Sequence, residues 1–335
     1  MDDSAFARKV VREMLSTSPL IEVVGSARDG EEALELASSL SVDLVICDLH
    51  MPKLDGVSFV RLQMQRRPLP ILILSAAAQD AGEMIDALNA GAIDVVRKPT
   101  ALATDDLRAI RDELVEKITA AANAPIGNLT RELVSAPSSS VASQPGKFGI
   151  VVLGISTGGP QALRRMMPLF PATFPVPLAI VLHMPVGYTA LYAEKLNEIC
   201  TLSVKEAEEG DVLKPGHVLL APAGRHLMFR RTARGDVVAQ LAMQPLEKIH
   251  RPSADVLFRS AADLYRERVL AVVMTGMGDD GKEGAAWVKA QGGTVITESE
   301  KSCVIYGMPR SVVEAGLSDA AVTLDEMTDA ITSRL

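Results

Sequence analysis

The stretch 149–160 reads G-I-V-V-L-G-I-S-T-G-G-P. Its apolar, β-branched part, Ile150–Leu153, predicts a buried strand. Pro160 suits the first turn of a helix, so Ser156 is expected on a tight strand-to-helix turn. The glycines on either side of Ser156 permit sharp backbone angles, and the N–H groups at the start of a helix can bind an anion or an oxyanion.

Two interpretations of this turn are open. The spacing Gly154-x-Ser156-x-Gly158 matches the nucleophile elbow, in which the serine is catalytic. A glycine-rich turn between strand and helix is also the usual cradle of a phosphate or a dinucleotide. Against the second interpretation, the turn lacks the P-loop lysine, and it has serine where the dinucleotide fingerprint has its second glycine.

Composition limits the class of protein. A chain of 335 residues suggests two domains, and 48 % hydrophobic with 23 % charged residues is typical of a soluble globular protein. No apolar run approaches the ~20 residues that span a bilayer, and the N-terminus has no signal-peptide core. The three cysteines are scattered without metal-ligand spacing. We therefore expect a cytoplasmic monomer that does not insert into a membrane.

Charge argues against nucleic-acid binding. The net charge is −8, and residues 1–122 contribute −7 of it, with 13 Lys and Arg against 20 Asp and Glu. An acidic first half disfavours contact with a phosphate backbone. Aromatic residues make up 4 % of the chain, too few to suggest a base-stacking surface. No basic helix follows the linker, so an output domain that binds DNA is not expected.

A linker divides the chain. Residues 135–146 are rich in Ser, Pro and Ala, which predicts a first domain at 1–122, a linker at 123–147 and a second domain at 148–335. In the first domain the predicted strands are Ile21–Ser26, Val42–Cys47, Ile71–Leu74 and Ile93–Val96. The predicted helices are Ala5–Ser16, Gly30–Ser39, Val57–Arg66, Ala81–Ala90 and Asp105–Ala122. This alternation predicts a parallel sheet that is covered on both faces.

Polar residues stand where the strands of the first domain end. Asp48, Ser75 and Lys98 each follow an apolar run, and Asp2-Asp3 precedes the first helix. The carboxyl ends of parallel strands form the ligand edge of such a sheet. Clustered carboxylates suit Mg²⁺, and a carboxylate beside that ion can attack a phosphoryl group.

These residues make the first domain resemble a two-component receiver domain, which has a flavodoxin-like fold. The matching motifs are Asp2-Asp3-Ser4, Asp48-Leu-His-Met-Pro-Lys-Leu-Asp-Gly56, Ser75-Ala76 and Lys98-Pro99. The resemblance implies Asp48 as phosphoacceptor, a Mg²⁺ site made by Asp2, Asp3 and Asp48, and phosphoryl sensing by Ser75 and Lys98.

One feature departs from the receiver pattern. Receivers have an apolar first strand before the acidic pair, whereas this sequence starts at Met1-Asp2-Asp3. That strand belongs in the middle of the sheet, so we expect a gap lined by apolar surface and unpaired backbone groups. Our hypothesis is that the native start lies upstream, and the intact mass of the protein from its native source tests it.

The second domain is predicted as a doubly wound parallel α/β domain. The predicted strands are Gly149–Ile155, Leu178–Leu182, His217–Ala221, Val237–Met243, Val269–Thr275 and Gly293–Thr297. The predicted helices are Pro160–Leu169, Tyr188–Ile199, Ser253–Tyr265, Gly281–Gln291 and Arg310–Ala315. A hydroxyl nucleophile needs a base and an acid that orients the base.

Of the five histidines, His183 directly ends an apolar run and falls at the same sheet edge as Ser156. His50 is interpreted as a surface residue, and His250 lies in a polar stretch. Asp279 and Asp280 follow another strand, and either could cap the next helix or accept a hydrogen bond from the Nδ1–H of a histidine. The chain order Ser–His–Asp differs from that of α/β hydrolases, but the triad recurs on unrelated folds.

The second domain is similar to the catalytic domain of the chemotaxis protein-glutamate methylesterase (CheB) family. The matching motifs are Gly154-Ile-Ser-Thr-Gly-Gly159, His183-Met-Pro185, Ala221-Pro222, His250-Arg-Pro-Ser253, Thr275-Gly-Met-Gly-Asp-Asp-Gly281 and Tyr306-Gly-Met-Pro-Arg310. The resemblance implies Ser156 as nucleophile, His183 as general base and Asp280 as orienting acid. Asp280 is preferred over Asp279 because it directly precedes Gly281 in the family's T-G-M-G-x-D-G pattern. Thr157 and Met277 match positions that line the oxyanion site, and no cofactor is expected in this domain.

The family resemblance implies the activity and the partners. We expect hydrolysis of glutamate methyl esters, and deamidation of glutamines, on the cytoplasmic part of methyl-accepting chemotaxis receptors. A chemotaxis histidine kinase would supply the phosphoryl group. The unphosphorylated receiver is expected to cover the active-site edge, and phosphorylation of Asp48 is expected to weaken that contact. The alternative is a phosphorylation-controlled signalling module that binds a nucleotide at residues 154–159.

Overall fold

The computed structural model describes residues 1–335 except 76–79, 100–103, 123, 126, 128–145 and 249. The chain divides into two compact units, Met1–Arg131 and Glu132–Leu335. This division falls within the predicted linker 123–147, most of which lies outside the described residues. Within the described ranges, no helix combines the length and apolar character that a membrane crossing requires.

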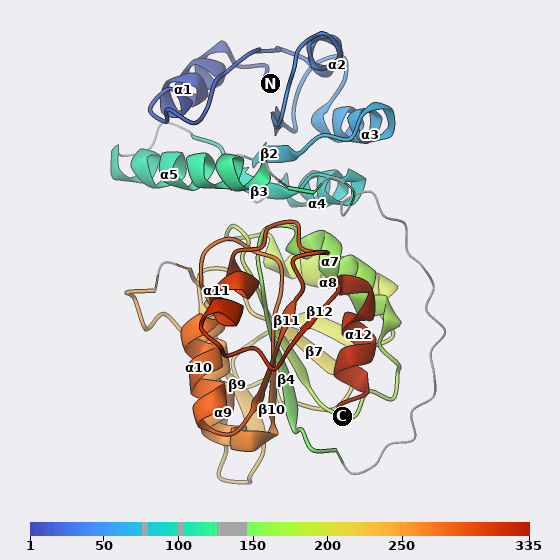
Figure 1. The fold of residues 1–335 in the computed structure, drawn as a ribbon, viewed down its shortest axis with the longest axis vertical. Helices are drawn as coiled ribbons and strands as arrows, with labels where there is room; N and C mark the ends of the chain where they lie inside the picture. Colours follow the sequence, from blue (N-terminus) through green and yellow to red (C-terminus); the bar gives the residue numbers. More distant parts are fainter. Residues whose placement is uncertain (76–79, 100–103, 123, 126, 128–145, 249) are drawn as a thin grey trace. The chain divides into compact units, whose positions relative to one another are not determined.

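The first unit is built on a parallel sheet with the strand order β1-β2-β3 (Figure 1). Its strands are β1 (Val45–Asp48), β2 (Ile71–Ser75) and β3 (Asp94–Arg97). Its helices are α1 (Ala5–Leu15), α2 (Gly30–Ser39), α3 (Gly56–Arg66), α4 (Ala81–Ala90) and α5 (Thr104–Ala121). All five predicted helices and three of the four predicted strands are confirmed. The central strand β2 is buried along its whole length because its run of apolar side chains has helices on both sides.

The prediction of a strand at Ile21–Ser26 is wrong. This segment carries no ladder of hydrogen bonds, and Val23 and Val24 are 39 % and 47 % exposed. Its composition favours a strand, but a strand needs a neighbour with which to pair. The apolar first strand of a receiver would be that neighbour, and this sequence does not contain it.

Met1 and Asp2 lie between β1 and segment 21–27, where the first strand of a receiver would end. The Met1 ammonium donates to the Ile46 carbonyl at 2.7 Å, and the Asp48 N–H donates to the Met1 carbonyl at 3.1 Å. On the other side, the Asp2 N–H donates to the Ala27 carbonyl at 3.2 Å.

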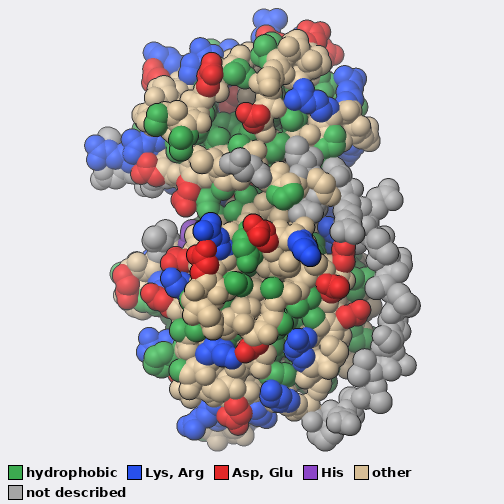
Figure 2. All heavy atoms as spheres, viewed as in Figure 1, with side chains coloured by type: hydrophobic (Ala, Val, Ile, Leu, Met, Phe, Trp, Pro, Cys, Tyr) green, Lys and Arg blue, Asp and Glu red, His purple; other side chains and the backbone are tan. Residues whose placement is uncertain are grey.

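Beyond these two residues lies a cavity of about 530 Å³, which we call the strand slot. Segment 21–27, α1, α2 and β1 contribute to its lining. The space-filling view shows the unit hollowed between α1 and α2, with hydrophobic side chains in the recess (Figure 2). The gap that the sequence predicted is therefore present.

The second unit is built on a seven-stranded parallel sheet with the order β12-β11-β10-β4-β5-β7-β6. Its strands are β4 (Ile150–Ile155), β5 (Leu178–Leu182), β6 (Ser203–Glu206), β7 (His217–Leu220), β10 (Val269–Val273), β11 (Thr294–Glu298) and β12 (Ala320–Val322). Its α-helices are α7 (Gly159–Met166), α8 (Thr189–Ile199), α9 (Ala254–Tyr265), α10 (Lys282–Ala290), α11 (Met308–Glu314) and α12 (Leu324–Thr332). In Figure 1, α9, α10 and α11 cover one face of the sheet and α7, α8 and α12 cover the other, which confirms the doubly wound fold.

The second unit also differs from the sequence-based expectation. The predicted strand Val237–Met243 is present as β9 (Val237–Ala242), but it pairs antiparallel with β8 (His226–Arg231) in a separate two-stranded sheet. The strands β6, β8 and β12 and the helix α12 were not predicted. The sequence of β6, S-V-K-E, has one buried residue, Val204, because β6 lies at the edge of the sheet.

The register of the central strands sets the position of the candidate site. Ile155 of β4 pairs with Leu182 of β5, and Gly154 pairs with Val273 of β10. The chain therefore leaves three adjacent strands at one edge. A Cβ at Gly154 would lie 2.6 Å from the Cβ of Ala254, so glycine allows α9 to pack directly on the strand that carries the serine turn.

Candidate active site

Ser156 lies on the tight turn between β4 and α7. Its N–H donates to the Thr275 carbonyl at 2.9 Å, and its own carbonyl accepts the Gly159 N–H at 2.6 Å. Gly158 has φ +79°, a left-handed conformation that favours glycine at this position. The predicted strand-to-helix turn is confirmed, and it brings the serine to the carboxyl edge of the sheet.

His183 lies beside this turn, on the neighbouring strand end. Its backbone N–H donates to the Ile155 carbonyl at 3.2 Å, and its ring nitrogen Nε2 lies 2.8 Å from Oδ2 of Asp280. From the sequence, the carboxylate is expected to accept a hydrogen bond from the Nδ1–H of the histidine, whereas in the structure it lies against Nε2. Among the described residues, His183 Nδ1 is buried without a hydrogen-bond partner. Nδ1 is therefore the nitrogen left to accept a proton.

Asp280, rather than Asp279, meets the histidine. Asp279 is exposed, whereas Asp280 is buried and also accepts hydrogen bonds from Ser253 Oγ at 2.7 Å and from the Ala254 and Asp255 N–H groups at 2.7 and 3.1 Å. Burial alone would raise the pKa of Asp280, but the hydrogen bonds from His183, Ser253 and Ala254 outweigh it and hold the pKa below its usual range. The carboxylate is therefore ionised and fixed in orientation.

Asp255 and Asp280 each accept hydrogen bonds from the start of the helix next to the other residue. Asp280 caps the start of α9, while Asp255, in the first turn of α9, accepts the N–H groups of Gly281 and Gly284 at the start of α10, at 2.9 and 2.8 Å. Lys248 lies 2.8 Å from the same carboxylate. Burial and the nearby charge of Asp280 raise the pKa of Asp255. Two carboxylates thus join the N-termini of two helices, where the unpaired N–H groups favour negative charge.

His250 contacts the candidate base. Its ring stacks on the His183 ring with centroids 4.1 Å apart and an interplanar angle of 18°. From the sequence, His250 lies in a polar stretch and opens the motif His250-Arg-Pro-Ser253, but it has no expected role in the site, because nothing in its local sequence shows a contact with a residue 67 positions earlier. The stacked ring restricts rotation of His183 about its side-chain bonds, while Asp280 holds one of its nitrogens.

We expect His250→Ala to lower kcat for ester hydrolysis about 3- to 10-fold, because a stacked aromatic pair contributes about 0.5–1.5 kcal/mol beyond burial. His250→Phe keeps a flat ring in the same place and is expected to retain near-normal kcat. Steady-state kinetics with KM unchanged would identify a positioning effect. Equal losses in the Ala and Phe variants would contradict the stacking role.

Thr157 and Met277, the residues expected at the oxyanion site, both lie next to the serine turn. Thr157 is buried, and its carbonyl accepts the Thr275 hydroxyl at 3.0 Å. Met277 follows Gly276, where a Cβ would come within 2.8 Å of Ser156 Cβ. Both positions are therefore adjacent to the serine, and oxyanion binding by them stays a prediction.

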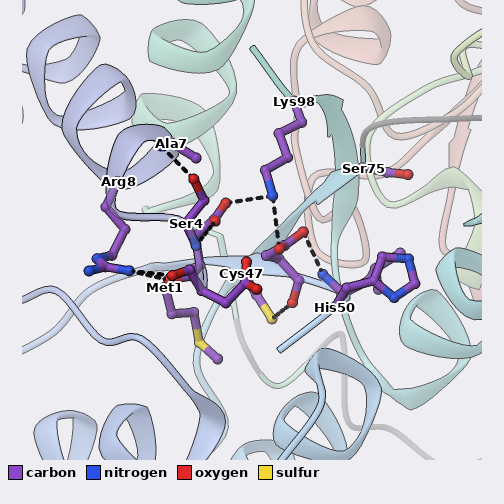
Figure 3. Close-up of polar contacts among 12 residues, drawn as sticks. Met1, Ser4, Ala7, Arg8, Cys47, His50, Ser75 and Lys98 are labelled. Atoms are coloured by element: carbon purple, nitrogen blue, oxygen red, sulfur yellow. Dashed lines mark hydrogen bonds and ion pairs between the residues drawn. The ribbon is translucent and has the colours of Figure 1, made fainter. Parts of the chain in front are cut away.

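In the first unit, the predicted acidic cluster is formed. One carboxylate oxygen from each of Asp2, Asp3 and Asp48 lies within 4.8 Å of the others. Lys98 Nζ lies 2.8 Å from Asp2 and 2.9 Å from Asp48, and Figure 3 shows it reaching to both carboxylates. Hard oxygen donors at this spacing fit Mg²⁺.

Electrostatics support cation binding at this cluster. Burial raises the pKa of Asp48; the hydrogen bond from Lys98 opposes that shift, and the charge of Asp2 adds to it. The Leu49 N–H donates to Asp48 Oδ1 at 3.0 Å and orients the carboxylate. A divalent cation would relieve the repulsion between these carboxylates.

Ser75 stands on the neighbouring strand end but not in contact with the cluster. Its hydroxyl donates to Asp80 Oδ2 at 3.2 Å, and in Figure 3 it points away from Lys98. His50 holds the same aspartate through Nε2 at 3.1 Å and reaches Glu83 through Nδ1 at 3.3 Å. His50 is exposed, as predicted, but it is also part of this polar cluster.

The two units define a response regulator: a receiver fold with an acidic cluster beside a lysine, followed by an α/β output domain with a serine turn and an imidazole–carboxylate pair. Comparison with known families matches the response regulator receiver domain at residues 1–110 and the CheB methylesterase at residues 151–331. The chain belongs to the CheB methylesterase family.

Curated relatives match almost the whole chain. Protein-glutamate methylesterase/protein-glutamine glutaminase 5 of Myxococcus xanthus is 47 % identical, with 98 % of this chain and 94 % of the relative covered. The protein-glutamate methylesterase/protein-glutamine glutaminase of Halalkalibacterium halodurans is 40 % identical, with 99 % of this chain and 96 % of the relative covered. Among solved structures, the Thermotoga maritima CheB methylesterase catalytic domain is 40 % identical, with a TM-score of 0.55, covering 56 % of this chain and 99 % of that one.

Proposed function

We propose that the protein hydrolyses glutamate methyl esters on methyl-accepting chemotaxis receptors, with Ser156 as nucleophile, His183 as base and Asp280 as orienting acid. The observation that carries this proposal is the His183–Asp280 pair, 2.8 Å long, on the strand end next to Ser156. The names of the curated relatives support the substrate class. Methanol release from methylated receptor tests the proposal directly.

The reaction is an acyl transfer in two halves. His183 Nδ1 takes the Ser156 Oγ proton as Oγ attacks the ester carbonyl, and N–H groups at Thr157 and Met277 would hold the oxyanion. The ester C–O bond breaks, and methanol leaves with the proton from His183. Water then attacks the acyl-enzyme as His183 takes its proton, the bond between the acyl carbon and Ser156 Oγ breaks, and His183 returns the proton to Oγ, which leaves glutamate and free Ser156. Asp280 stays ionised and stabilises the imidazolium.

The same residues would deamidate glutamine. The leaving group is then ammonia instead of methanol, and His183 supplies the proton that the leaving nitrogen needs. The names of the curated relatives, which include protein-glutamine glutaminase, support this second substrate.

We further propose that phosphorylation of Asp48, by a chemotaxis histidine kinase in the cytoplasm, activates the esterase. Asp2, Asp3 and Asp48 would hold Mg²⁺, which when bound neutralises charge on the phosphoryl oxygens. Lys98 is within reach of Asp48 and would pair with the transferred group. Ser75 would leave Asp80 to donate its hydroxyl to the same group.

Asp48→Asn is expected to abolish stimulation by acetyl phosphate and Mg²⁺ while leaving the unstimulated rate of methanol release unchanged, because amide nitrogen cannot form the acyl phosphate. Asp43→Asn is the matched control, since Asp43 is exposed and precedes the same strand. Stimulation that survives in Asp48→Asn would show that the phosphoryl group is carried elsewhere.

The nucleotide-binding alternative has less support. A phosphate cradle uses backbone N–H groups and gives no role to the His183 imidazole, whose Nε2 is held by the Asp280 carboxylate. Labelling of Ser156 by a fluorophosphonate would favour the hydrolase. Tight binding of a nucleotide by a protein whose Ser156 does not react would favour the nucleotide-binding signalling module.

A further inference from the structure

The carboxyl edge of the main sheet holds another ionisable group, Glu298, at the end of β11. Its side chain is 0 % exposed. Oε2 accepts the Thr275 N–H at 2.9 Å, and Oε1 accepts the Ser302 hydroxyl at 2.9 Å. Among the described residues Glu298 forms no ion pair, so its carboxylate depends on these hydrogen bonds. The reaction described above does not use it.

Thr275 links Glu298 to the serine turn. Its carbonyl accepts the Ser156 N–H at 2.9 Å, and its hydroxyl donates to the Thr157 carbonyl at 3.0 Å. The remaining polar group of its backbone, the N–H, is the one that Glu298 holds. Because the strands β11, β10 and β4 are neighbours, the hydrogen bonds run in one row from Glu298 through Thr275 to Ser156. Ile155, the residue before Ser156, accepts the backbone N–H of His183 on the next strand, β5.

We propose that Glu298 is a positioning residue for the nucleophile: through Thr275, its carboxylate holds the backbone of Ser156 and Thr157 in the orientation that hydrolysis requires. This inference rests on the hydrolysis proposed above. It concerns a residue two strands away from the nucleophile, which acts without touching the substrate.

The charge of Glu298 makes this support sensitive to pH. Burial raises its pKa to about 7, against the opposing hydrogen bonds from Thr275 and Ser302. Among the residues that the structure describes, two titratable groups act on it: the buried Cys303 thiol, which hydrogen-bonds to it, and Arg165 of α7, which is paired with Asp325 of α12 at 2.5 Å. Hydrogen bonds to an ionised acceptor are about twice as strong as neutral ones. Protonation below pH 7 would therefore loosen Thr275 and, with it, the serine turn.

The test compares the pH dependence of methanol release in the full chain and in Glu298→Gln. A glutamine can still accept the Thr275 N–H, but it does not titrate. We expect the acid limb of log(kcat/KM) to contain two ionisations in the natural sequence and one in Glu298→Gln, with KM unchanged. Glu298→Leu removes the acceptor and is expected to lower kcat about 10-fold or more. Glu298→Gln is expected to recover part of this loss, because its neutral amide oxygen still accepts the Thr275 N–H but binds it more weakly than the carboxylate does.

Glu300→Gln is the matched control, since Glu300 is exposed two residues further along the chain, and its pH profile is expected to match that of the natural sequence. If the Glu298→Gln profile superimposes on the natural one, the proposal is overturned. If the natural chain releases no methanol at any pH, the hydrolase assignment itself fails, which is a distinguishable result.

A measurement of stability identifies the titrating group independently of catalysis. The folded-state pKa of Glu298 lies above its ordinary value of 4.5, so folding is favoured most below pH 4.5 and loses that contribution as pH rises through 7. Glu298→Gln cannot ionise, so this loss of folding stability at high pH does not occur in the variant. We expect its urea midpoint to exceed that of the natural chain at pH 8.5 and to match it near pH 5. Equal midpoints at both pH values would show that Glu298 does not titrate near 7 and would overturn the pH-dependent part of the proposal.

Discussion

Ser156→Ala is expected to lower the rate of methanol release by roughly 10⁴-fold or more while the protein stays folded. The hydroxyl supplies the bond-forming atom, and no neighbouring group can replace it without a different mechanism. The N–H of residue 156 would still donate to Thr275 in the alanine variant, so the turn is retained. The measurement is methanol released per enzyme from methylated receptor, with the far-ultraviolet circular dichroism spectrum as the check on folding.

Ser253→Ala offers a control for this experiment. Ser253 is also a buried serine, and it donates to Asp280 rather than facing the base. Its loss is expected to weaken catalysis only partly, and a fluorophosphonate should still label Ser156 in that variant. Methanol release that survives in Ser156→Ala would exclude the proposed nucleophile.

The second large effect concerns the strand slot of the first unit. An extension of five residues rich in Val and Ile, joined directly before Met1, is expected to stabilise this unit by at least ~2 kcal/mol. A single Leu→Ala cavity costs about 3–5 kcal/mol, and the gain from filling a larger cavity exceeds the entropy lost by ordering the extension.

Hydrogen exchange in the full chain measures this effect locally. Amides of β1 and of segment 21–27 are expected to gain protection, since both border the slot. A five-residue Gly/Ser extension of the same length is the control, because it can form backbone hydrogen bonds but brings no apolar side chains. Equal protection in both extensions would show that apolar filling of the slot contributes nothing.

Long apolar runs made most of the fold predictable. Leu178–Leu182 and Val269–Val273 are buried on both faces of their sheet, and such strands have a sequence signature that does not depend on their partners. Ile21–Ser26 has a similar signature without forming a strand, since pairing depends on a neighbour that local sequence does not reveal. Edge strands such as Ser203–Glu206 bury too few apolar side chains to be recognised from the sequence.

The candidate site was predictable where a polar residue directly ends an apolar run. Ser156, His183 and Asp48 all follow this rule. Glu298 does not follow this rule directly, because Thr297 separates it from the apolar pair Val295-Ile296, and the predicted strand stopped at Thr297. His250 carries no such signal: it lies in a loop, and its stacking on His183 is a long-range contact that spacing along the chain cannot show.

The reciprocal caps of α9 and α10 have an evolutionary consequence. Asp280 accepts hydrogen bonds from the start of α9, and Asp255 accepts those from the start of α10, so the proposed orienting acid also stabilises the fold. A library of variants selected only for folding, with no demand for esterase activity, should therefore keep aspartate at position 280 while Ser156 drifts freely. Relatives that have lost esterase activity are likewise expected to keep aspartate at position 280 and to vary at position 156.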